Sequence, residues 1–174
     1  MKIVAINGSL RNPSTPSANA ALMRAAARVA PEGVEVVLYG GLGELPPFNP
    51  DLDAEGSTPP PAVAELRQLL IGADAVLISS PEYAHGVPGA LKNLLDWLVS
   101  VGELVDKRVA LVNAARVGGQ YAQAALLEIL RTMNWHIVPE ATLTEPFVTE
   151  KIVGELTEEA ALEKLREALA ALVG

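Results

Sequence analysis

The residues best suited to chemistry near the start of the chain lie between Gly8 and Asn19. Gly8 allows a tight backbone turn. Ser9 and Ser17 offer hydroxyl groups, and Arg11 offers a planar guanidinium that binds phosphate through two parallel hydrogen bonds. The segment ends where a helix is expected to begin, and the free N–H groups and dipole of a helix N-terminus favour an anion. We therefore expect an anion site here; the alternative is an ordinary capped turn with a solvated Arg11.

The type of anion can be narrowed from what the loop lacks. No Gly-Lys-Ser/Thr sequence follows it, so it is not a Walker loop, and it has no Gly-x-Gly-x-x-Gly fingerprint of a dinucleotide site. A monophosphate is therefore a better fit than a pyrophosphate.

A second candidate loop is "SSPEYAHGVPG" (79–89), which contains a Tyr and a His. Its backbone is restricted by Pro81 and Pro88, whereas Gly86 and Gly89 allow conformations that other residues rarely adopt. Its backbone N–H and C=O groups suit the polar edge of a flat ligand. Tyr83 is expected to form an aromatic wall, or alternatively to pack within the loop. His85 is expected to be exposed and not catalytic.

A third loop, "NAARVGGQY" (113–121), contains two adjacent glycines. Because Gly118 and Gly119 have no Cβ, their backbone N–H groups can approach a ligand closely. The alternative is that both residues are glycine only because the turn requires positive φ.

The elements that position these loops follow from hydrophobic periodicity. Apolar runs predict strands at Ile3–Ile6, Val34–Tyr39, Asp74–Ser79 and Arg108–Asn113, with a fifth, Pro-interrupted edge strand in Trp135–Thr144. Helical spacing predicts helices from Ala18 to about Pro31, at Ala62–Ile71, Pro88–Val101 and Gln120–Asn134, and a last one that is capped by Thr157. The segment Gly40–Pro61 has little periodicity.

Alternation of strands and helices predicts an α/β fold with a parallel sheet covered on both faces. Five strands fit a doubly wound sheet of order 2-1-3-4-5 in one domain over residues 1–174. Such sheets bind ligands beyond the carboxyl ends of their strands, at the switch point beside the first strand. This rule selects the loops after Asn7, Ser79 and Asn113, which are the three loops described above.

Composition excludes several classes of protein. The chain has 174 residues and no Cys, which removes disulfides, thiolate catalysis and thiolate metal sites. A net charge of −8 argues against nucleic-acid binding. The apolar runs are too short to span a membrane and no leader is visible, so a soluble, cytoplasmic protein is expected. We expect the acidic run Asp51–Glu55 to be a solvated loop, and expect no metal site.

The motifs of the first two loops resemble those of a known family. "GSLR" after the first strand, Ser-x-Asn at the first helix and "PEY…G-x-PG-x-LKN-x-x-DW" after the third strand resemble the NADPH-dependent FMN reductases. These flavodoxin-like, three-layer proteins include quinone, azo-dye and chromate reductases, and the resemblance covers nearly the whole chain. It implies that Ser9, Arg11, Ser17 and Asn19 hold the FMN phosphate. It also implies that Pro81, Glu82, Tyr83 and Gly86 lie along the flavin and that Gly118 and Gly119 complete the ring site.

The sequence departs from the family pattern at three points. Five residues separate Arg11 from Ser17, where many members have two, so Ser14 or Thr15 could replace Ser17. Ala84 stands where an Asn often follows the Tyr, and Gly86 where a Ser is frequent.

The resemblance implies a ping-pong oxidoreductase. NADPH or NADH would reduce bound FMN, and a quinone, nitro, azo, metal-oxyanion or free-flavin acceptor would then be reduced in turn. The cofactor carries this chemistry, and we identify no catalytic side chain. The alternatives are a flavodoxin-type electron carrier and a flavin-free scaffold or sensor. The resemblance also implies a homodimer or homotetramer, with Leu94–Val101 as an apolar patch unless Trp97 belongs to the core.

Overall fold

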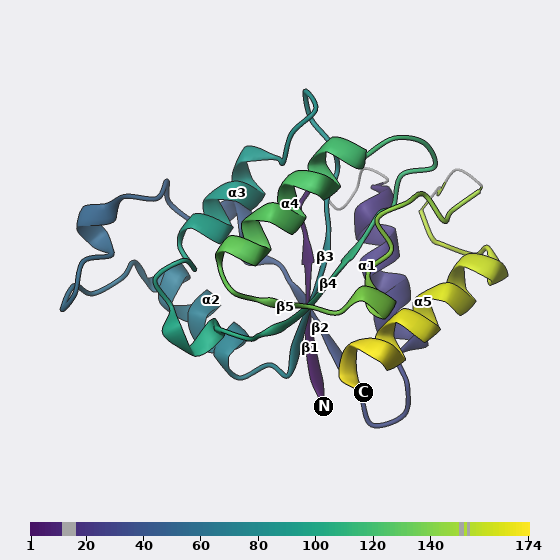
Figure 1. Cartoon of the computed structure of the whole chain (residues 1–174), viewed down its shortest axis with the longest axis horizontal. Helices are drawn as coiled ribbons and strands as arrows, with labels where there is room; N and C mark the ends of the chain where they lie inside the picture. Colours follow the sequence, from purple (N-terminus) through teal and green to yellow (C-terminus); the bar gives the residue numbers. More distant parts are fainter. Residues whose placement is uncertain (12–16, 150–151, 153) are drawn as a thin grey trace.

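A computed structural model describes residues 1–11, 17–149, 152 and 154–174, and Figure 1 shows its fold. Five parallel strands form one sheet of order β2-β1-β3-β4-β5, as the sequence predicts. The strands are β1 Lys2–Asn7, β2 Glu35–Tyr39, β3 Ala75–Ser79, β4 Arg108–Val112 and β5 His136–Ile137. The helices are α1 Ala18–Val29, α2 Pro61–Ile71, α3 Gly89–Asp96, α4 Gln120–Thr132 and α5 Glu159–Val173.

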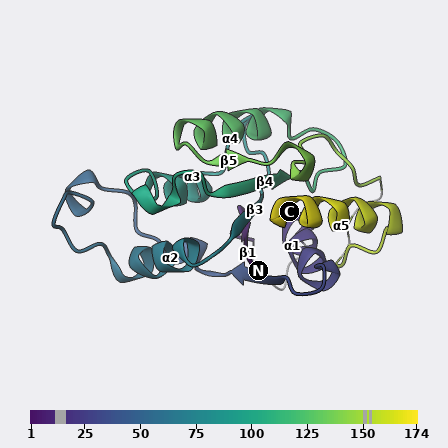
Figure 2. The same ribbon diagram turned by 60° about the horizontal axis from the view of Figure 1, so that its bottom comes forward.

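The sheet separates two apolar cores because successive strand residues point to opposite faces. In β1, Val4 and Ile6 enter the core shared with α2, α3 and α4, whereas Ile3 and Ala5 enter the core shared with α1 and α5. Figure 2 shows α2, α3 and α4 on one side of the sheet and α1 with α5 on the other. Coverage of both faces explains why the strands read as continuous apolar runs.

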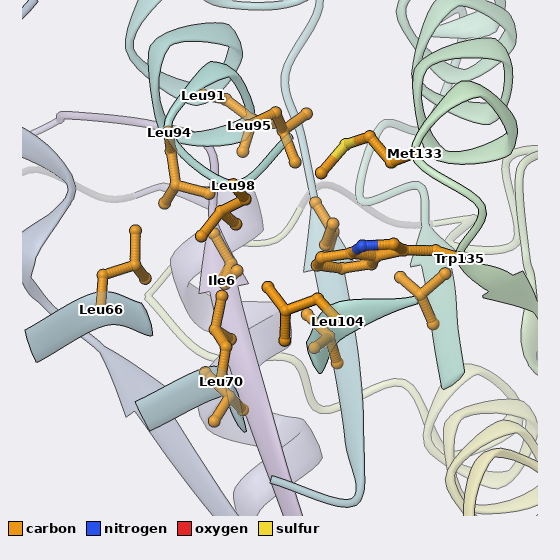
Figure 3. Close-up of a cluster of buried hydrophobic side chains, with 14 of the residues drawn as sticks. Ile6, Leu66, Leu70, Leu91, Leu94, Leu95, Leu98, Leu104, Met133 and Trp135 are labelled. Carbon is orange, nitrogen blue, oxygen red and sulfur yellow. The ribbon is translucent and has the colours of Figure 1, made fainter. Parts of the chain in front are cut away.

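The first core is rich in leucine and contains both tryptophans. In Figure 3, leucines of α2 and α3 surround the first strand, and Trp135 lies beside Leu104. Trp97 is fully buried, and its Nε1 donates to the carbonyl oxygen of Pro46 at 2.8 Å. Trp97 is therefore a core residue, and the expected apolar surface patch at Leu94–Val101 is not present, because most of its large side chains point inward.

The segment between β2 and α2 contains two short 3₁₀ helices, Gly41–Glu44 and Pro50–Leu52. It is fastened by Asn93, which accepts from the backbone N–H of Phe48 at 2.7 Å and donates to the carbonyl oxygen of Pro46 at 2.9 Å. The acidic run is not wholly solvated as expected. Asp53, with a side chain only 9% exposed, pairs with Arg67 at 2.6 Å.

The fifth strand is shorter than predicted. Only His136–Ile137 pairs with β4, and Pro139 opens a 3₁₀ helix, Pro139–Ala141. Proline has no N–H to donate to a ladder, so the strand ends before it. The chain then returns to β4, where the N–H of Leu143 donates to the carbonyl oxygen of Leu111 at 2.8 Å.

Two helix boundaries also differ from the prediction. α3 ends at Asp96 with Trp97 as its C-cap, before a non-helical turn to Val101. α5 begins after Glu158, not after Thr157; the carboxylate of Glu158 accepts from the backbone N–H and the hydroxyl of Thr149. Among the described residues, no helix combines the length and apolarity needed to cross a membrane.

Candidate functional site

The loops that follow β1, β3 and β4 meet at one edge of the sheet, as the switch-point rule predicts. The N–H of Gly8 donates to the carbonyl oxygen of Ser79 at 2.8 Å, which holds the first two loops together. A Cβ on Gly8 would lie 2.9 Å from a methyl group of Leu91 and 3.3 Å from that same carbonyl oxygen. This close approach is the physical reason for a glycine at the end of β1.

The second and third loops and the start of α1 line a hollow of about 350 Å³, the flavin-side hollow. It contains five of the predicted site residues: Asn19, Pro81, Glu82, Gly118 and Gly119. Its remaining lining is small or backbone-rich, as in the run Asn113–Ala115. Such a surface presents mainly peptide edges, which suits a flat polar ligand.

Arg11 and Tyr83 lie elsewhere. They line a second hollow of about 340 Å³, the α3-side hollow, together with Gly8, Leu10 and the start of α3. The structure therefore divides the predicted residues between two hollows rather than one. Ser9, Ser17 and Gly86 support the loops without lining either hollow.

The α1 end of the site is built from short side chains. Ser17 is the N-cap of α1, as expected, and its hydroxyl accepts from the N–H of Ala20 at 3.4 Å. The carbonyl oxygen of the Asn19 side chain accepts from the buried Ser79 hydroxyl at 2.7 Å, which ties α1 to the end of β3. The first turn of α1 contains no acidic residue. An anion at this helix N-terminus would therefore meet no carboxylate from the first turn of α1.

The beginning of the first loop is also ordered by local hydrogen bonds. The side chain of Asn7 accepts from the N–H of Ser9 at 3.1 Å, and the hydroxyl of Ser9 accepts from the N–H of Arg11 at 3.3 Å. These bonds order the backbone of the first loop as far as Arg11. The alternative hydroxyls, Ser14 and Thr15, lie outside the described residues.

The second loop has a tight turn at Tyr83–Gly86. Tyr83 and Gly86 exchange two backbone hydrogen bonds of 3.1 and 2.9 Å. The two central residues, Ala84 (φ 49°) and His85 (φ 57°), are both left-handed, which is costly for residues with a Cβ. Tyr83 is 54% exposed, so it is not packed within the loop.

The same loop contacts the first turn of α4 twice. An oxygen of the Glu82 carboxylate accepts from the N–H of Ala122 at 2.9 Å. The exposed ring of His85 stacks on Tyr121, with centroids 4.2 Å apart and planes inclined by 21°. The Glu82 side chain is thus engaged with the first turn of α4.

The third loop is organised by Asn113, which the sequence analysis did not identify as a site residue. The buried amide of Asn113 donates to the carbonyl oxygens of Gly118 and Thr144, both at 3.0 Å, and accepts from the N–H of Ala115 at 2.9 Å. The signal was an Asn that closes an apolar strand, which is also the position of Asn7 in β1.

The backbone conformation of Gly118 and Gly119 agrees with the alternative that the turn requires positive φ at both. Both have positive φ, 81° at Gly118 and 92° at Gly119. A Cβ on Gly119 would lie 2.8 Å from Nδ2 of Asn113, whereas one on Gly118 would meet only the side chain of Gln120 at 3.8 Å. At Gly119 the contact with Asn113 leaves no room for a side chain. Gly118 has open space beside it.

Other chemistry is not indicated at this edge. No group of three or more His, Cys, Asp or Glu side chains that could hold a metal occurs within the described ranges. A larger hollow of about 610 Å³ lies along β5, lined by Arg131, Trp135 and His136 among others. It contains none of the predicted site residues.

Comparisons with known proteins bear on this site. Residues 1–150 match the family model described as NADPH-dependent FMN reductase. The chain is 33% identical over 180 residues to an NADPH:quinone oxidoreductase of Arabidopsis thaliana, covering 99% of this chain and 90% of that protein. It is 32% identical to an NAD(P)H-dependent FMN reductase of Pseudomonas aeruginosa, with 99% and 93% of the two chains covered.

The fold is also found among solved structures. FerB, a flavoenzyme NAD(P)H:(acceptor) oxidoreductase from Paracoccus denitrificans, superposes with a TM-score of 0.80 at 27% identity. The match covers 99% of this chain and 94% of FerB.

Proposed function

Because the chain belongs to the family of NADPH-dependent FMN reductases, we propose that the three loops described above form its FMN site. The protein is an NAD(P)H-dependent flavoenzyme, and FMN supplies hydride and electron chemistry when it is bound. The observation that supports this placement is that the second and third loops and the start of α1 meet around a hollow lined mostly by small residues.

The flavin phosphate is proposed to bind at the N-terminus of α1, with Ser9, Arg11, Ser17 and Asn19 around it. Two helix N-termini border the flavin-side hollow, and they differ in charge. That of α4 already faces the Glu82 carboxylate, whereas the first turn of α1 has no acidic residue. A phosphate with nearly two negative charges therefore favours α1.

The flavin ring is proposed to lie along the backbone of Pro81–Tyr83 and beside Gly118, with Gly86 supporting the turn. Gly119 is assigned the indirect role that its contact with Asn113 indicates. These residues bind and orient the ring and exclude water from one face. Tyr83 borders the neighbouring α3-side hollow, where its aromatic face suits the reductant or an acceptor.

The electron acceptor is a small molecule, and we propose a quinone. Relatives with 33% and 28% identity are named as quinone oxidoreductase or quinone reductase, and they cover nearly the whole chain. NAD(P)H and the acceptor are proposed to use the same exposed flavin face in turn. We assign no side chain of the described site as an acid or base.

Flavin titration of the apoprotein tests the placement. FMN is expected to bind more tightly than FAD and much more tightly than riboflavin, because only FMN presents a terminal phosphate to α1. Equal affinity for FMN and riboflavin would contradict the phosphate assignment. Anaerobic addition of NADPH and then NADH should bleach the flavin spectrum and show the preferred reductant.

Steady-state turnover tests the acceptor. Oxidation of NAD(P)H should accelerate when a soluble quinone is added to the FMN-loaded protein. Reduction of the bound flavin without quinone turnover would argue for an electron carrier instead.

We also propose a homodimer, or a pair of such dimers. Large apolar side chains are exposed around the site, with Val117 82% exposed and Tyr83 and Tyr121 about half exposed. Burial of such a rim against a second copy would be favourable. Light scattering that reports a monomer at micromolar concentration would contradict this. The cytoplasmic location and the single domain over 1–174 stay predictions.

A further inference from the structure

α4 has no capping side chain of its own. Its N-cap is Gly119, and no residue of its first turn is acidic. The N–H groups of a first helical turn have no partner within the helix, and an N-cap side chain normally accepts from the second or third of them. At α4 this acceptor comes from a distant loop, because Glu82 bonds the N–H of Ala122, 40 positions away.

The loop that contains Glu82 is itself anchored to the same turn. Figure 1 shows the β3–α3 loop rising beside the start of α4. The His85 ring stacks on Tyr121, and Asn113 holds the carbonyl oxygen of Gly118 from the opposite side. The Gly118–Gly119 segment is thus fixed between β4 and the β3–α3 loop.

We propose that Glu82 is a positioning residue that acts through α4. Its carboxylate fastens the first turn of α4, and with it the Gly118 wall of the flavin-side hollow, before flavin binds. The negative charge is favourable at a helix N-terminus. This inference rests on the proposed function for its ligand, although the fastening itself is a property of the free protein.

The β3–α3 loop and the loop that contains Gly118 then act together in binding the flavin ring. Both Glu82 and Gly118 line the flavin-side hollow, one from each loop. Removing the carboxylate should let the wall move without touching the α1 phosphate site. FMN and riboflavin should therefore lose affinity by the same factor, whereas loss of a phosphate ligand affects FMN alone.

The test uses three substitutions of Glu82 and one control. Glu82→Ala removes the cap, Glu82→Gln keeps an oxygen that accepts from the N–H of Ala122, and Glu82→Asp keeps the charge on a shorter side chain. Asp74→Ala is the matched control, because the carboxylate of Asp74 accepts from the N–H of Lys2 at 2.6 Å, at the opposite edge of the sheet.

In the apoprotein, Glu82→Ala should speed hydrogen exchange at the amide of Ala122 by about tenfold or more, as expected for loss of a charged hydrogen bond. FMN and riboflavin should both bind on the order of tenfold more weakly. Glu82→Gln should restore most of both properties, and Glu82→Asp should fall between. Asp74→Ala should change neither.

Unchanged exchange at Ala122 in Glu82→Ala would overturn the proposal. So would faster exchange with unaltered flavin affinity, or a loss confined to FMN. If Glu82→Ala does not fold, Glu82→Gln and Glu82→Asp decide by the same two measurements. A wild-type protein that binds no flavin would refute the proposed function, while the exchange measurement would still report on the fastening of α4.

Discussion

Replacing Asn113 by Ala tests whether the fold of the third loop and flavin binding are coupled. The side chain makes three hydrogen bonds of 2.9–3.0 Å and is almost fully buried. At roughly 1 kcal/mol net for each bond, the substitution should lower the free energy of unfolding by about 3 kcal/mol. For a protein of this size that corresponds to a fall of about 6–12 °C in melting temperature.

Asn93→Ala provides a control with the same chemistry at another place. Asn93 makes two comparable bonds, to Phe48 and Pro46, in the segment between β2 and α2. Asn93→Ala should lower the free energy of unfolding by about 2 kcal/mol. Urea unfolding of the apoproteins gives both values, and flavin fluorescence gives the affinities.

The two variants should differ in flavin binding. Asn113→Ala frees the carbonyl oxygen of Gly118 and should weaken both FMN and riboflavin by about tenfold, equivalent to about 1.4 kcal/mol. Asn93→Ala should leave both affinities unchanged. If Asn113→Ala loses the expected stability but binds both flavins like the wild type, the loop is not part of the ring site and the reasoning is refuted.

Three further substitutions test separate features. Arg11→Ala should weaken FMN binding by roughly ten- to 150-fold, because a charge-assisted hydrogen bond is worth about 1.5–3 kcal/mol; riboflavin should bind as before, and an equal loss for riboflavin would contradict the assignment. Neither amide atom of buried Gln123 has a hydrogen-bond partner among the described residues. Gln123→Met should therefore leave the free energy of unfolding, measured by urea titration, unchanged or raise it by about 1–2 kcal/mol. A clear fall in that free energy would mean that the amide is hydrogen-bonded. Burial and the charges of Glu44 and Glu65 raise the pKa of Tyr39 from 10.0 to about 12. The unfolded chain releases this proton first, so stability should fall as the pH rises from about 10 towards 12; Tyr39→Phe should remove that part of the pH dependence.

The sequence was sufficient for the sheet and for the three loops that meet at its carboxyl end. Continuous apolar runs such as Ile3–Ile6 identified strands covered on both faces, and the switch-point rule identified the three loops at their ends. The sequence was less informative where the same residue pattern is compatible with two local structures. The pattern around Pro139 reads as an interrupted strand, and only the structure shows that the ladder stops before it.

The long-range contacts of the site could not be read from the sequence. Glu82 was expected along the flavin, but its carboxylate is engaged by an N–H 40 residues away. Asn113 had only its position at a strand end as a signal, because its partners in Gly118 and Thr144 depend on tertiary structure. Hydrophobic periodicity predicts which face of an element is buried, and it contains no information on which polar groups meet.

The placement of α5 has a consequence for synthesis on the ribosome. α5 and α1 together cover one face of the sheet, and α5 alone contributes Leu162, Leu165, Leu169 and Leu172 to that core. Because α5 follows every strand in the chain, apolar residues of β4 such as Ala110 and Val112 are not covered by α5 until that helix has left the exit tunnel. At roughly 5–20 residues per second, the interval between completing β4 and completing α5 lasts on the order of 3 to 12 s. During this time the nascent chain exposes a sheet face to aggregation, and chaperone capture should be strongest just before α5 emerges.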